Sequence, residues 1–152
     1  MSMNGIDISH WQDGINLNVV PCNFVIVKAT QGTKFVDPCC NKFYQAAKKA
    51  GKKLGVYHFA DGKSSGTAEA DHFIQNVKGY IGEAILVLDW EADALKKGVA
   101  YAKEFLDRVF EVTGVRPLIY MSKSVCREYD WSSVVAANYG LWMAQYANKE
   151  RT

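Results

Sequence analysis

Six short apolar segments, rich in β-branched and aromatic residues, recur along the chain and alternate with segments of helical periodicity. They are residues 5–9, 24–29, 54–59, 85–89, 118–122 and 141–146. Most are almost continuously apolar, which is typical of strands buried on both faces of a parallel sheet. Strands that alternate with helices predict βα units with right-handed crossovers. The expected fold class is therefore α/β, with a (β/α) TIM-like barrel as the leading architecture.

The intervening segments carry helix signals of different strength. Asp37 is placed to cap a helix that ends just before Gly51. A second helix is expected to begin near residue 67, and a third to cover residues 96–113, because apolar residues recur there at spacings of three and four. Residues 123–138 are expected to be helical only in pieces.

The length of the chain limits how much of a barrel it can form. An eight-stranded barrel typically needs about 250 residues, whereas this chain has 152. The sequence therefore predicts one domain over residues 1–152, an incomplete barrel with six of about eight strands. An open barrel leaves strand edges unpaired, so self-association through these edges is expected.

Composition and charge exclude several classes of function. A net charge of +2 is too small to indicate nucleic-acid binding. No apolar run reaches the roughly 18 residues of a membrane span, so no membrane insertion is expected. Residues 1–7 show no secretory signal, which predicts synthesis in the cytoplasm. The four cysteines lack zinc-like spacing, and free thiols are favoured over a disulfide or a metal site.

The segment AILVLDWEA, residues 84–92, carries the strongest chemical signal. Side chains alternate along a strand, so Asp89 and Glu91 share one face, roughly 6.5 Å apart along the backbone, while Trp90 points the other way. Barrel enzymes place catalytic groups at the carboxyl ends of strands. Glycoside hydrolysis uses two carboxyl groups, one with a raised pKa beside one that stays ionised. The alternative is a solvated strand end, because Asp-x-Glu alone is common.

A third acid strengthens the catalytic interpretation. Asp7 lies in the first predicted strand between Ile6 and Ile8 and must point away from both. A lone buried carboxylate is costly, so Asp7 is expected to be either paired or functional. Three acids at one end of one barrel predict the catalytic group of Glu91, Asp89 and Asp7.

Aromatic residues surround these acids in the predicted fold. Sugar rings pack on aromatic faces and phenolic hydroxyls bond to sugar oxygens. The alternative is barrel core. Lys28 is either a substrate contact or, as the favoured alternative, a buried partner for a carboxylate. The predicted substrate-binding residues are Tyr57, Phe59, Tyr120, Trp142, Tyr146, Trp11 and Lys28.

Six segments resemble, in the same order, the motifs of glycoside hydrolase family 25, the muramidase or lysozyme family that includes catalytic domains of phage endolysins. They are GIDISHWQ (5–12), FVIVKATQGT (24–33), GVYHFA (55–60), LVLDWE (86–91), RPLIY (116–120) and LWMAQY (141–146). The resemblance spans residues 5–146. Any one of these segments alone would be a weak signal.

The resemblance implies hydrolysis of the β-1,4 bond between N-acetylmuramic acid and N-acetylglucosamine in peptidoglycan, without a metal or other cofactor. Carried over by position, Glu91 is the general acid, and Asp89 orients the acetamido group or bound water. Asp7 sets the local charge, and Tyr57 and Tyr120 line the sugar site. Both direct attack by water and prior attack by the acetamido group remain open.

The resemblance also bears on where the protein acts, and it leaves other functions open. The missing signal favours an endolysin-like protein of a phage with a Gram-positive host, acting on the cell wall after release. No wall-binding repeats are recognisable, and the family's carboxylate on the last strand has no counterpart. One alternative is therefore a weak or inactive fragment that binds wall glycan. A chitinase is disfavoured because apolar residues replace its longer acidic run, and a metabolic α/β enzyme because phosphate-binding glycines are absent.

Overall fold

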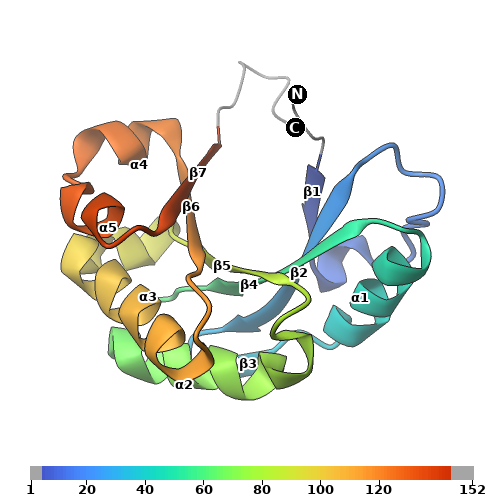
Figure 1. Cartoon of the computed structure of the whole chain (residues 1–152), viewed down its shortest axis with the longest axis horizontal. Helices are drawn as coiled ribbons and strands as arrows, with labels where there is room; N and C mark the ends of the chain where they lie inside the picture. The colour runs from blue at the N-terminus through green and yellow to red at the C-terminus, as the bar shows by residue number, and fades with distance from the viewer. Residues whose placement is uncertain (1–4, 145–152) are drawn as a thin grey trace.

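The computed structural model describes residues 5–144 of the chain. Its centre is a curled seven-stranded sheet, six strands of which are parallel in the order β1-β2-β4-β5-β6-β7. The helices lie on the outer side of the curl, and β1 and β7 form its two ends (Figure 1). The predicted α/β fold of the barrel type is confirmed.

All six predicted strands are present. The parallel strands are β1 (Gly5–Ile8), β2 (Phe24–Gln31), β4 (Lys53–Phe59), β5 (Ile85–Asp89), β6 (Leu118–Ser122) and β7 (Gly140–Ala144). A seventh strand, β3 (Phe35–Val36), pairs antiparallel with β2 and was not predicted. Two residues are too few to show the period-2 alternation by which a strand is recognised.

The helices differ from the prediction mainly at their starts. They are η1 (His10–Gln12), α1 (Cys40–Lys49), α2 (Gly66–Val77), η2 (Lys78–Tyr80), η3 (Ala92–Lys97), α3 (Val99–Thr113), α4 (Lys123–Glu128) and α5 (Ser132–Ala136). The second predicted helix and the broken helical segment near residues 123–138 are confirmed.

Two helix starts were predicted wrongly. Asp37 does not cap α1, which begins three residues later. Its Oδ1 accepts the N–H of Cys39 at 2.9 Å and its Oδ2 accepts the N–H of His10 at 3.0 Å, so this carboxylate joins α1 to η1. The third helix does not begin at residue 96, because Gly98 has φ +84° and separates η3 from α3.

The alternation of side chains on the strands decides where a site can form. Leu86 and Leu88 of β5 belong to the apolar core beneath the helices. Val87 and Asp89 point to the inner side of the curl, where they line a cavity. Asp89 is also the last residue of β5, and barrel enzymes place catalytic groups at the carboxyl ends of their strands. Among residues 5–144, no helix is both long and apolar enough to cross a bilayer.

Candidate active site

A cavity of about 210 Å³ lies on the inner side of the curled sheet. Every parallel strand, or the residues directly after it, contributes to its wall. It is lined by Asp7, Ile26, Tyr57, Val87, Asp89, Glu91, Tyr120 and Trp142. Six of these were predicted as site residues, and the structure brings them together although they are spread from position 7 to position 142.

Asp89 and Glu91 form the chemical centre of this cavity. Burial, a hydrogen bond with Glu91 and the negative charges of Glu91 and Asp7 raise the pKa of Asp89 well above its ordinary value. Lys28 acts in the opposite direction. The Oδ1 atom of Asp89 is buried and, among the described residues, has no hydrogen-bond partner. Asp89 therefore keeps its proton to a higher pH than an ordinary aspartate does.

Glu91 lies at a junction between two cavities. Besides the cavity around Asp89, it lines a neighbouring one of about 300 Å³, which is also lined by Tyr120 and Tyr129. Its backbone is extended, with φ −161°. The next residue, Ala92, has φ +55°, which turns the chain sharply into η3. Glu91 is therefore the carboxyl group that is accessible from both cavities.

Asp7 lines the cavity, as predicted, but its exposure differs from the prediction. Its side chain lines the cavity, and its charge contributes to the raised pKa values of Asp89 and Tyr57. The residue is exposed, however, and not buried as its apolar neighbours suggested. The reason is that β1 is an end strand of the described sheet, so its inner face is not covered on both sides.

The aromatic wall of the cavity consists of Tyr57, Tyr120 and Trp142. The rings of Tyr120 and Trp142 meet edge to face, with centroids 4.9 Å apart. Burial, and then the charges of Asp7 and Asp89, raise the pKa of Tyr57 far above its ordinary value. Its hydroxyl therefore stays protonated and can donate to a sugar oxygen.

Lys28 and Phe59 lie beside the cavity and are not part of its lining. Lys28 is buried and donates from Nζ to Gln31 Oε1 at 2.6 Å. Its Nζ lies 5.1 Å from the ring centroid of Phe35 and 5.2 Å from that of Phe59. Burial lowers its pKa, while the charges of Asp37 and Asp89 raise it. This environment supports the favoured role of Lys28 as a partner of carboxylates. Its charge interacts electrostatically with those of Asp37 and Asp89.

Of the remaining predicted site residues, one lies apart from the cavity and one lies outside the described residues. Trp11 is on η1 with 80% of its surface exposed, and its ring lies tilted against that of His10 with centroids 4.6 Å apart. Tyr146 lies outside the described residues.

Sequence reasoning missed several residues of the site region. Ile26 and Val87 line the cavity but resemble ordinary core positions. Ser122, Glu128 and Tyr129 line the neighbouring cavity. The last two lie where α4 ends, in a stretch whose broken periodicity gave no signal of facing the site.

The geometry of the cavity is typical of one class of enzyme. Two neighbouring carboxyl groups, one of them with a raised pKa, in an aromatic-lined cavity at the carboxyl ends of barrel-type strands are suited to acid-catalysed cleavage of a glycosidic bond. Among residues 5–144, no group of three or more His, Cys, Asp or Glu side chains is placed to hold a metal ion. The two carboxyl groups and the aromatic wall of the cavity are features of a glycoside hydrolase.

The chain belongs to family 25 of the glycosyl hydrolases, whose sequence model matches residues 6–152. An N,O-diacetylmuramidase from Chalaropsis sp is 34% identical over 142 residues, which cover 81% of this chain and 67% of that enzyme. The chain spans about half the length of several other curated relatives that it matches.

Solved structures agree with this membership. The bacterial lysozyme from Streptomyces coelicolor has a TM-score of 0.80 at 30% identity, over 97% of this chain and 76% of that chain. The catalytic domain of endolysin ply40, from bacteriophage P40 of Listeria monocytogenes, has a TM-score of 0.75 at 26% identity, over 97% and 75% of the two chains. The family and the fold predicted from the sequence are confirmed, and the chain is a glycosidase domain.

Proposed function

We propose that this chain is a muramidase that hydrolyses the β-1,4 bond between N-acetylmuramic acid and N-acetylglucosamine in peptidoglycan. The observation that carries the proposal is the placement of Asp89 and Glu91 together in one cavity walled by aromatic rings. The names of the relatives, which include a muramidase and a lysozyme, support this choice of glycan.

Glu91 is the proton donor in this proposal, because it is the member of the pair that lines both cavities. Its proton passes to the glycosidic oxygen as the bond from that oxygen to the sugar carbon breaks. Asp89, which lines the same cavity, orients either water or the acetamido group. In both routes the hydroxyl of one water ends on the sugar carbon and its proton returns to the carboxyl pair.

The positive charge that develops on the sugar also needs stabilisation. Asp7 lines the same cavity and supplies negative charge to it. Tyr57 donates a hydrogen bond, and Tyr120 with Trp142 offers an aromatic surface for a pyranose ring.

Product analysis tests this function directly. Purified Gram-positive peptidoglycan is digested, the new reducing ends are reduced with borohydride, and the sugars are hydrolysed and identified. Muramitol is the expected product, since a muramidase leaves N-acetylmuramic acid at the reducing end. Glucosaminitol alone would indicate cleavage of the other bond, and an absence of new reducing ends would leave only the glycan-binding alternative.

We also infer an endolysin-like role, in which a phage-encoded or prophage-encoded chain lyses the wall of a bacterial host after release from the cytoplasm. The likeness to the catalytic domain of endolysin ply40 supports this role. Added from outside, the chain is then expected to clear a suspension of Gram-positive cells, which turbidity measures. Cleavage of purified peptidoglycan without lysis of any such cells would contradict the role but not the enzymatic function.

A further inference from the structure

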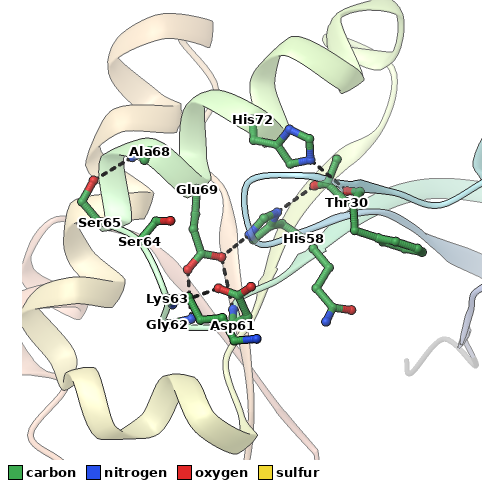
Figure 2. A network of polar contacts seen from close by, with 12 residues as sticks. Thr30, His58, Asp61, Gly62, Lys63, Ser64, Ser65, Ala68, Glu69 and His72 are labelled. Carbon is green, nitrogen blue, oxygen red and sulfur yellow. Dashed lines mark hydrogen bonds and ion pairs between the residues drawn. The ribbon is translucent and has the colours of Figure 1, made fainter.

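A buried chain of hydrogen bonds lies on the helix-covered side of the sheet, behind the cavity (Figure 2). His58 lies on β4 next to Tyr57 but points the opposite way, toward α2 and α3. Its Nδ1 lies 2.7 Å from Thr30 Oγ1, and its Nε2 lies 2.7 Å from Glu69 Oε1. Thr30, His58 and Glu69 are all fully buried, with 0% of their surface exposed. The catalytic scheme uses none of these groups.

Glu69 carries a negative charge in this buried position because four donors surround its carboxylate. Oε1 accepts from His58 and from the N–H of Asp61 at 3.2 Å, and Oε2 accepts from the N–H of Gly62 at 3.1 Å and from the Tyr101 hydroxyl. Burial alone would raise the pKa of Glu69, but the hydrogen bonds from His58 and Tyr101 outweigh it and lower the pKa. Burial lowers the pKa of His58, so a neutral imidazole donates from Nε2 to an ionised carboxylate.

The loop that Glu69 holds contacts the main chain at Asp89 and again after Glu91. The N–H of Ala60 donates to the carbonyl oxygen of Asp89 at 3.3 Å. Gly62, at φ +73°, packs so closely on η3 that an added Cβ would lie 3.3 Å from Ala94 Cα. The segment that begins at Asp89 and continues into η3 therefore rests against a loop whose backbone is fixed by one buried carboxylate.

The turn inside this segment needs such support. Ala92, directly after Glu91, has φ +55°, a conformation that residues with a side chain rarely adopt. Backbone of this kind persists where the surroundings over-determine it, and it often marks functional sites. Tyr101, which donates to Glu69, also has its ring centroid 5.8 Å from that of Trp90, the residue between the two acids.

We propose that Glu69, together with His58 and Tyr101, is a positioning unit for the catalytic pair. It holds the main chain that presents Asp89 and Glu91, and it does not touch the substrate. The inference rests on the proposed function, because its catalytic consequence is a consequence for that reaction. Displacement of a reacting group by about 1 Å can cost about 100-fold in rate, so the unit acts on kcat and leaves binding largely unchanged.

The test compares Glu69→Gln with Asp71→Asn. Asp71 is an exposed acid on the same helix, paired with Arg108, and is a matched control. With soluble peptidoglycan strands as substrate, Glu69→Gln is expected to lower kcat per folded molecule by about 10–100-fold, with KM within about two-fold. Asp71→Asn is expected to leave both unchanged. Equal kcat in the two variants, or a change confined to KM, would overturn the proposal.

A second variant and a second measurement keep the test decisive if Glu69→Gln does not fold or if the chain shows no activity. Tyr101→Phe removes one hydroxyl and keeps the ring beside Trp90, and it is expected to lower kcat several-fold. Hydrogen–deuterium exchange of the peptide over residues 89–98 is expected to be faster in Tyr101→Phe and Glu69→Gln than in Asp71→Asn. Unchanged exchange would overturn the positioning role. An inactive wild-type chain would refute the proposed function alone, since the exchange comparison does not depend on activity.

Discussion

The side chains of Asp89 and Glu91 line the same cavity at the carboxyl end of β5. The two acids are separated by one residue, so the strand directs both to the inner side of the sheet while Trp90 is buried on the other side. The fold thus forces two negative charges into one small cavity, and a retained proton relieves their repulsion. In the proposed reaction, a proton of this pair is transferred to the glycosidic oxygen.

Asp89→Asn is expected to change how stability depends on pH. The raised pKa means that the folded chain holds this proton more tightly than the unfolded chain does. The associated stability is fully present below the ordinary pKa of about 3.9 and is lost as pH rises through the folded value. The melting temperature of Asp89→Asn should therefore rise relative to that of the wild type as pH increases from about 4 to about 8. A difference that stays constant over this range would contradict the raised pKa.

Lys28→Met is expected to move the pH–rate profile. The positive charge of Lys28 lowers the pKa of Asp89, so its removal raises the pKa of Asp89 further. If activity needs a proton on Asp89, which is lost as pH rises, the alkaline limb of the profile should move to higher pH. Methionine keeps an unbranched, uncharged side chain of nearly the same length between Phe35 and Phe59. An alkaline limb that stays in place or moves to lower pH would rule out this electrostatic role.

Tyr57→Phe tests whether the cavity binds sugar through its phenolic hydroxyl. Loss of one hydrogen bond of about 1 kcal/mol predicts a fall in kcat/KM of about five-fold. Tyr80→Phe is the matched control, because the hydroxyl of Tyr80 donates to Asn41 Oδ1 at 2.9 Å on another part of the surface. Equal kcat/KM in the two variants would remove Tyr57 from the substrate-binding residues.

The ends of the described sheet predict weak self-association. Among residues 5–144, β1 pairs only with β2 and β7 pairs in parallel only with β6. Leu141 and Met143 of β7 alternate with Trp142 and are 37% and 44% exposed. Strand edges with apolar residues recruit other chains. Light scattering should show an apparent mass that rises with concentration, and Met143→Lys should reduce this rise. A concentration-independent monomer in both proteins would contradict the prediction.

The position of the site was predictable because it depends on short-range patterns. Continuous apolar runs indicate buried parallel strands, and the alternation of side chains places Asp89 and Glu91 on one face. Since parallel strands bring their carboxyl ends to one side of the sheet, Tyr57, Tyr120 and Trp142 could be assigned to the same cavity from widely separated segments.

What the sequence did not reveal depends on packing between distant elements. The contact of His58 with Glu69 exists only because α2 lies over β4, and no spacing rule encodes that placement. The exposure of Asp7 follows from the position of β1 at the end of the described sheet. Asp37 was read as a helix cap from its local neighbours, but its Oδ2 instead binds His10 from a segment 27 residues away.

Glu91→Gln tests the central claim most directly when cleavage and binding are measured on the same peptidoglycan preparation. The change keeps the shape of the side chain and removes its ability to donate a proton as an acid. The account predicts that the release of reducing ends falls by roughly 10²–10⁴-fold, while the amount of protein that sediments with peptidoglycan stays near that of the wild type. Reducing ends released at the wild-type rate by a folded Glu91→Gln chain would contradict the account.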